Sequence, residues 1–109
     1  MNIAEASNHI AELLGMLNNA YWEASSLENK DANYNLVRIL TNEYIELMKI
    51  SVQDHHYPYE VISTTQESLQ NYLYDYQQHR LKSVIRFETQ RHLGESLNQL
   101  LAYFSKSGK

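Results

Sequence analysis

Residues that interrupt helices are scarce in this chain, and that scarcity is the strongest constraint on its fold. Only three glycines and one proline occur among its 109 residues, whereas these two residue types together make up about 12% of an average protein. Collagen-like chains, Gly/Pro-rich low-complexity chains and turn-dense β-sandwiches all need many more of them. Leu, Ile, Val and Phe make up about a quarter of the chain, above the roughly 20% below which chains tend to stay disordered. The composition therefore predicts a folded, all-α protein.

Apolar residues recur every seven positions between residues 3 and 27. The two series are Ile3, Ile10, Leu17 and Ala24, and Ala6, Leu13, Ala20 and Leu27. They occupy the a and d positions of four heptads, which predicts a helix with one side turned to the core. The small side chains of Ala6 and Ala20 are expected to let a neighbouring helix approach closely.

Polar, cap-forming residues at 25–31 predict a connection to a second helix at about 32–52. The main apolar side of this second helix is expected to carry Val37, Leu40, Tyr44, Leu47 and Met48. Other apolar residues lie off that side, namely Tyr34, Ile39, Ile45, Ile50 and Val52. A helix that is apolar on several sides is covered on several sides, so it lies centrally in a bundle or contacts a second subunit. Glu43 and Glu46 are expected to face solvent.

Pro58 marks the clearest break, in segment 53–59, because proline has no amide hydrogen and favours an extended residue before it. From Thr64 to about Ser105 only Gly94 interrupts the helical pattern. One helix of that length would measure about 63 Å, whereas a compact chain of this size has a radius of gyration of about 13 Å. A single straight helix therefore does not fit a globular monomer.

The apolar side of this last segment changes within residues 79–92. Either the chain bends there, which is the interpretation we favour, or one long helix uses one face within its subunit and another across a dimer. The expected fold is therefore a single domain, residues 1–109, that forms an antiparallel bundle of three to four helices.

Charge is unevenly distributed along the chain, whose net charge is −4. Residues 1–79 contain eleven acidic and three basic residues, whereas residues 80–109 contain six basic and two acidic residues. A basic group made of Arg80, Lys82, Arg86 and Arg91 is a candidate for binding the phosphates of a nucleic acid. The alternative, which the overall acidity favours, is that this segment packs beside the acidic part of the same chain or of a second subunit.

No motif in the sequence specifies a reaction or a bound cofactor. The absence of cysteine excludes disulfides and cysteine-based metal centres, and the isolated glycines cannot form a phosphate-binding loop. Glu88, His92 and Glu95 share a helical face, and His55 and His56 are adjacent in a loop. Both patterns are more typical of an ordinary polar surface than of a metal site. We therefore expect no catalytic residue, no cofactor and no metal.

Tyrosine is over-represented, with nine of the twelve aromatic residues. Tyrosine is enriched at interfaces because it combines a large ring with a hydroxyl group. Six residues are therefore candidates for a contact surface: Tyr57, Tyr59, Tyr72, Tyr74, Tyr76 and Trp22. The alternative is that most of these tyrosines lie at the rim of the core, with their hydroxyl groups in water.

These features predict a non-enzymatic protein-binding module of the small acidic adaptor, inhibitor or immunity type that acts as a homodimer. The alternative is a nucleic-acid-binding regulator that uses residues 79–92. Because the chain has no basic segment followed by an apolar run at its start, and no long apolar stretch, we expect a cytoplasmic protein without a secretory signal or a membrane span.

Overall fold

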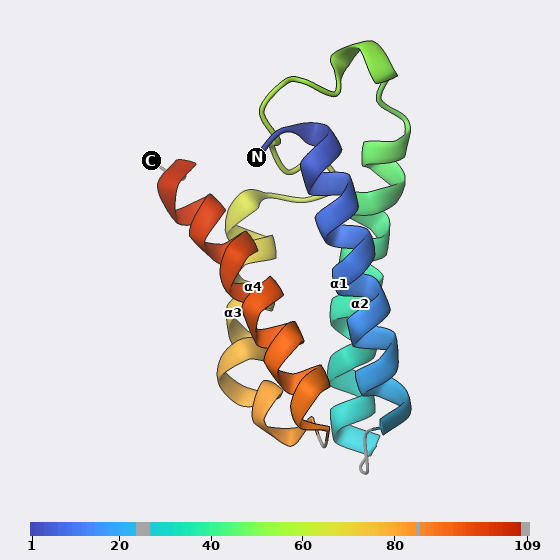
Figure 1. The fold of residues 1–109 in the computed structure, drawn as a ribbon, viewed down its shortest axis with the longest axis vertical. Helices are drawn as coiled ribbons and strands as arrows, with labels where there is room; N and C mark the ends of the chain where they lie inside the picture. Colours follow the sequence, from blue (N-terminus) through green and yellow to red (C-terminus); the bar gives the residue numbers. More distant parts are fainter. Residues whose placement is uncertain (24–26, 85, 108–109) are drawn as a thin grey trace.

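The chain folds into two antiparallel helical hairpins that pack side by side (Figure 1). The computed structural model describes residues 1–23, 27–84 and 86–107, without the side chains of 21–23, 27–30, 32, 83 and 107. Its elements are α1 (Ile3–Glu23), α2 (Leu27–Met48), η1 (Val52–Asp54), α3 (Gln66–His79), η2 (Leu81–Ser83) and α4 (Phe87–Ser107), where η marks a short 3-10 helix. Helices α1 and α2 form one hairpin, and α3 and α4 form the other. The predicted all-α antiparallel bundle is confirmed.

The core lies between the hairpins and uses one side of each helix. The predicted heptad positions of α1 are all buried from Ile3 to Ala20, while Ala24 lies outside the described residues and Leu27 belongs to α2. Helices α3 and α4 add Leu69, Leu73, Tyr76, Leu93, Leu97, Leu100 and Phe104. Because these positions repeat at helical spacing, each helix presents a continuous apolar side to the others.

The change of apolar side predicted a bend, and the structure has this bend between α3 and α4. Val84 is buried there in an extended conformation. The side-chain amide of Gln90 in α4 donates to the carbonyl oxygens of Leu81 (3.2 Å) and Val84 (3.4 Å), which holds the turn against α4. Gly94 leaves room for this contact, since a Cβ atom there would lie 3.1 Å from Cδ2 of Leu81. The molecule is 43 Å long, too short for one helix across this stretch.

Both predicted ends of α2 were wrong. The helix begins at Leu27 instead of near residue 32, because the Leu, Glu, Lys and Ala residues of 27–32 are strong helix formers that outweigh the cap-forming types among them. It ends at Met48 instead of near residue 52. The amides of Lys49 and Ile50 bond three residues back, as in a tightened last turn.

The core-facing side of α2 is also rotated from the predicted one. It runs through Leu36, Leu40, Glu43 and Leu47, all buried, whereas Met48 is exposed. Glu43 was expected in solvent and is instead fully buried. A buried polar residue therefore occupies a core position of α2.

The Glu43 carboxylate is satisfied by four donors from segment 59–63. It accepts hydrogen bonds from the Tyr59 hydroxyl (2.7 Å), the amides of Ile62 (3.0 Å) and Ser63 (2.8 Å), and the Ser63 hydroxyl (2.8 Å). A buried charge without such partners is strongly unfavourable. The solvent prediction for Glu43 failed because its donors lie 16 to 20 residues away along the chain, where no pattern on the helix itself reveals them.

Tyr59 ties this carboxylate to the rest of the same end of the bundle. Its amide donates to the Met1 carbonyl oxygen (3.0 Å), and its own carbonyl oxygen accepts from the Tyr103 hydroxyl (2.7 Å). Its ring lies beside those of Tyr103 and Phe104, with centroids 6.2 and 5.9 Å away. The connection that crosses this end in Figure 1 is thus held by α2, α4 and the start of the chain.

The first turn of α1 is capped from two directions. Asn2 and Glu5 form a reciprocal capping box, with distances of 2.8 and 2.9 Å. The amides of Ile3 and Ala4 donate to carbonyl oxygens of segment 55–57 (3.0 and 3.2 Å). Amides that lack a partner within the helix are therefore satisfied.

We expect Gly15→Ala to raise the free energy of unfolding by about 0.5–1 kcal/mol, because alanine loses less backbone entropy than glycine inside a helix. Nothing lies within 4 Å of the position that a Cβ atom would occupy at Gly15. Urea denaturation followed by circular dichroism measures the change. Gly94→Ala is the matched control and should gain less or lose stability, since its Cβ atom would press on Leu81. Equal gains at both sites would contradict the role given to Gly94 in the bend.

We expect Glu43→Gln to lower the free energy of unfolding by about 2–3 kcal/mol, because an amide cannot accept all the hydrogen bonds that the carboxylate accepts. Glu46→Gln is the control on the same helix, since Glu46 pairs with Lys49 at the surface (3.1 Å). Its effect should stay below about 1 kcal/mol. Similar losses in the two variants would show that the buried network adds nothing to stability.

Candidate functional site

Of the six aromatic residues predicted to form a contact surface, three are either buried or lie outside the described side chains. Tyr59 and Tyr76 belong to the core, with only 2% and 3% of their surface exposed. Trp22 has its side chain outside the described residues. The structure therefore leaves Tyr57, Tyr72 and Tyr74 as candidates on the described surface.

These three exposed tyrosines lie in different places. Tyr57 belongs to the connection between η1 and α3, directly before Pro58. Tyr72 lines a pocket between α2 and α3, and Tyr74 lines a groove between α3 and α4. Tyr72 and Tyr74 are two positions apart on α3 and so project toward different sides of the helix. The tyrosines do not form one patch.

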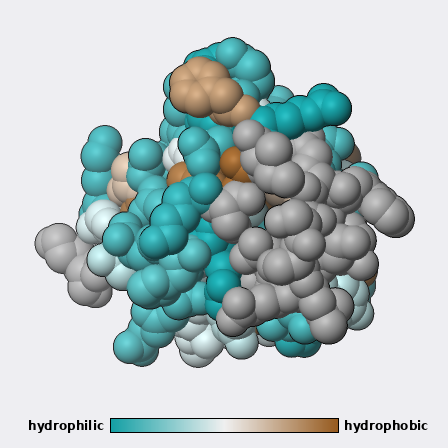
Figure 2. All heavy atoms as spheres, turned by 90° about the horizontal axis from the view of Figure 1, so that it is seen from below, coloured by the Kyte–Doolittle hydropathy of each residue, from teal (hydrophilic) through white to brown (hydrophobic). Residues whose placement is uncertain are grey.

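The four basic residues predicted as an alternative nucleic-acid-binding surface also lie on different sides of the molecule. Arg80 borders the pocket between α2 and α3, whereas Lys82 and Arg91 border a groove formed by α3, η2 and α4. Arg86 is exposed just before α4. Figure 2 looks onto this end of the molecule, where the coloured surface is mostly hydrophilic with a few hydrophobic side chains.

Arg91 is engaged by carboxylates of its own helix. It donates to Glu88 (2.8 Å) and Glu95 (3.3 Å). The hydrogen bond from Arg91, followed by its positive charge, holds the pKa of the Glu88 carboxyl below its usual value. His92 Nε2 lies 3.9 Å from Glu88 Oε1. Glu88 and Glu95 are thus both drawn to Arg91, and no group of three or more His, Asp or Glu side chains in the described part of the chain is placed to hold a metal ion.

The side of α2 turned away from the core carries a second heptad pattern, which we call the outer seam. Its positions alternate in steps of four and three: Tyr34, Arg38, Thr41, Ile45 and Met48 on α2, then Val52 in η1. Four of these side chains are large, apolar and exposed, by 60% for Tyr34, 48% for Ile45, 57% for Met48 and 81% for Val52. Of the apolar residues predicted to lie off the core side, Tyr34, Ile45 and Val52 are exposed, whereas Ile39 and Ile50 are partly buried against the core.

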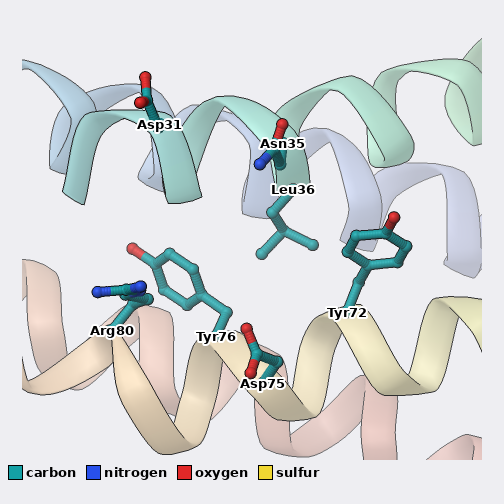
Figure 3. A pocket seen from close by; sticks show the side chains of 7 residues that line it. All are labelled: Asp31, Asn35, Leu36, Tyr72, Asp75, Tyr76 and Arg80. Atoms are coloured by element: carbon teal, nitrogen blue, oxygen red, sulfur yellow. The ribbon is translucent and has the colours of Figure 1, made fainter. Parts of the chain in front are cut away.

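A pocket of about 250 Å³ opens between α2 and α3 (Figure 3). Its lining consists of Asp31, Asn35 and Leu36 from α2, and Tyr72, Asp75, Tyr76 and Arg80 from α3 and its C-terminal end. In Figure 3, Leu36 points from α2 into the gap, Tyr72 and Tyr76 extend toward α2 from α3, and Asp75 lies close to α3 between them. Residues 72, 75 and 76 come together because positions three and four apart share a helical face.

The pocket combines an apolar floor with polar groups. Leu36 and Tyr76 are buried. Burial raises the pKa of Tyr76 above its ordinary value, so the hydroxyl stays protonated at physiological pH. Asp75 lies 3.8 Å from His79 Nε2 on an exposed stretch of α3. Asp75, Arg80 and the Tyr76 phenol therefore border the pocket from the α3 side, whereas the Asp31 carboxylate points away from α3 in Figure 3.

The sequence pattern does not reveal this pocket because its two walls come from helices far apart in the chain. Asp31 was interpreted as a helix cap and Asp75 was not singled out. The available signal was the placement of Tyr72, Asp75 and Tyr76 on one helical face. That signal identifies a polar and aromatic face but not the helix that lies opposite it.

Comparisons with protein-family models, with curated proteins and with solved structures give no match. None of the described helices is both long and apolar enough to cross a lipid bilayer.

We expect the protein to lose stability above about pH 10, because the unfolded chain then releases tyrosine protons that the folded chain retains. Burial, and then the hydrogen bond to Glu43, raises the pKa of Tyr59, and burial raises that of Tyr76. Each tyrosine should lower the free energy of unfolding by up to about 1.4 kcal/mol per pH unit in that range, with no such effect below it.

Urea denaturation between about pH 8 and pH 11 measures this dependence. The double variant Tyr59→Phe/Tyr76→Phe should flatten the alkaline slope, whatever its stability at neutral pH. The control Tyr57→Phe/Tyr74→Phe removes two exposed hydroxyl groups and should keep the slope of the original protein. A slope that falls equally in both variants would rule out the buried pair as its source.

Proposed function

We propose that this protein is a non-enzymatic protein-binding module that acts as a homodimer through the outer seam of α2. The observation that carries the proposal is the set of three exposed apolar side chains at heptad spacing on one side of α2, Tyr34, Ile45 and Met48, with the exposed Val52 following in η1. Monomeric soluble proteins rarely expose large apolar patches. A heptad seam is the pattern by which one helix packs against another.

A second copy of this chain is the partner that fits the seam best. A two-fold interface uses the same surface on both subunits, and a helix face of this kind can pair with itself. An antiparallel pair places the strongly apolar end, with Ile45, Met48 and Val52, against the end with Tyr34 and Arg38. The aliphatic part of the Arg38 side chain can then cover apolar surface while its charged group reaches water. A parallel pair would instead bring the two copies of Arg38 together, where like charges repel.

The proposed module is of the adaptor, inhibitor or immunity type, since such proteins act by holding another protein and need no reactive group. The absence of cysteine supports a cytoplasmic location. For the nucleic-acid alternative we find no comparable support. Arg80 borders one groove while Lys82 and Arg91 border another, and Arg91 is paired with two carboxylates.

We expect the protein to be a dimer at micromolar concentration, with a mass about twice the 12.8 kDa of one chain. Ile45→Glu should shift it to a monomer, because the change buries a charge in the seam. Asn42→Glu adds the same charge to an exposed position of α2 outside the seam and should leave the dimer intact. Light scattering coupled to size-exclusion chromatography measures the mass, and circular dichroism shows that the variants remain folded. A monomeric original protein, or equal dissociation of both variants, would contradict the proposal.

A further inference from the structure

Polar side chains line a groove between α3 and α4, the two antiparallel helices of the second hairpin (Figure 1). It consists of two adjoining depressions of about 500 and 430 Å³ that share Gln77 and Asn98, and we call the pair the α3–α4 groove. We infer that this groove binds an extended segment of a partner protein through hydrogen bonds to the backbone of that segment. The inference extends the proposed protein-binding role, but it is separate from the proposed dimer because the groove uses none of the residues of the outer seam.

The shape of the groove fits a linear chain better than a compact ligand. Its α4 wall runs from Arg91 to Ser105, which measures about 21 Å at a helical rise of about 1.5 Å per residue. Its α3 wall runs from Glu67 to Leu81 and Lys82 in η2. An extended chain covers about 3.3 Å per residue, so about six residues span this length. A single small ligand would occupy only one of the two depressions.

Side-chain amides are the commonest polar groups in the lining. Gln70, Asn71 and Gln77 come from α3 and Asn98 from α4, while Gln90 also borders the groove but donates to the turn after α3. A side-chain amide has both an acceptor and donors of hydrogen bonds. Each peptide unit of a partner likewise offers one N–H donor and one carbonyl acceptor. Neutral amides therefore match both groups of a peptide backbone.

The contact between Gln77 and Asn98 leaves one acceptor and one donor for such a backbone. Gln77 Nε2 donates to Asn98 Oδ1 across the groove, which uses a donor of the first amide and the acceptor of the second. Gln77 Oε1 can then accept a hydrogen bond and Asn98 Nδ2 can donate one. An extended residue points its N–H and carbonyl groups to the same side of the chain. One partner residue can therefore bond to both walls at once.

Tyr74 and Leu101 supply apolar contacts beside these amides, one on each wall of the larger depression. The Tyr74 residue is 57% exposed, so covering its ring removes apolar surface from water. Leu101 is half-buried. Successive side chains of an extended segment point to opposite sides, so they can contact Tyr74 and Leu101 in turn. Tyr74 is thus the candidate contact tyrosine that this groove would use.

Opposite charges lie at the two ends of the groove. Glu67 belongs to the first turn of α3, and Lys82 lies in η2 at the far end, and both are exposed. Arg91 and Glu95 beside Lys82 pair with each other (3.3 Å). A partner segment with a basic residue at one end and an acidic residue at the other therefore complements the groove. A strand of nucleic acid, which is negative throughout, would be repelled at Glu67.

A titration followed by amide NMR tests the inference with two blocked hexapeptides. The probes are Ac-Lys-Val-Ser-Val-Ser-Glu-NH₂ and the peptide of reversed sequence, one for each direction of the chain. We expect saturable shifts with at least one of them, confined to residues 67–82 and 91–105. Methylation of alternate backbone nitrogens keeps the side chains and charges but removes N–H donors, so it should weaken the binding at least about threefold.

Variants on the two walls distinguish the groove from the rest of the surface. Gln77→Ala and Asn98→Ala each remove one of the paired amides and should weaken the binding at least about threefold. Gln78→Ala and Gln99→Ala are matched controls at neighbouring exposed positions outside the lining and should leave it unchanged. Alanine is a strong helix former, so all four variants should fold, and the amide spectrum shows whether they do. The seam variant Ile45→Glu should bind the peptide like the original protein.

The inference is overturned if neither peptide gives saturable shifts at millimolar concentration, or if backbone methylation leaves the affinity unchanged. It is also overturned if the control variants weaken the binding as much as Asn98→Ala does. Maltotriose, titrated in parallel, is a neutral polyol that also bonds to amides, and tighter binding of maltotriose than of the peptides would assign the groove to a saccharide instead. A monomeric protein that binds the peptide contradicts only the proposed dimer, and a dimer that does not bind it contradicts only this inference.

Discussion

The buried carboxylate of Glu43 determines how α2 is oriented. It lies on the core side of α2 only because Tyr59, Ile62 and Ser63 supply its hydrogen bonds. With Glu43 inward, the helix turns Tyr34, Ile45 and Met48 outward, where they form the outer seam. A helix rotated so that Glu43 reached solvent would bury part of the seam and expose Leu36 or Leu40. One satisfied charge therefore decides which side of α2 is available to a partner.

The bend after α3 has a comparable effect on the second hairpin. Gln90 and Gly94 hold η2 against α4, so α3 is short enough to lie beside α2. That position brings the face with Tyr72, Asp75 and Tyr76 opposite Leu36 and creates the pocket. The outer seam and the pocket thus both involve α2, and the pocket side is partly covered by α3.

Local patterns in the sequence were enough to predict α1, whose apolar residues repeat without interruption from Ile3 to Ala20. They were also enough to predict the change of apolar side before α4, and hence the bend. These local patterns could not predict the rotation of α2, because the donors to Glu43 come from segment 59–63 and not from the helix itself. The tyrosines were ambiguous for a related reason. Spacing on α3 separates Tyr72 from Tyr74, but only the packing of α3 on α2 and α4 shows that Tyr76 is buried.

The division into two hairpins has a consequence for how the chain folds. Each hairpin joins helices adjacent in sequence, so its contacts close short loops and the loss of chain entropy is small. The Glu43 network is different, since it can form only after segment 59–63 has docked across the end of α2. We therefore infer that the hairpins form early and that the Glu43 carboxylate is desolvated last. The end of the bundle that holds Tyr59 would then also be the first to open, as a cooperative unit of lower stability than the helices beneath it.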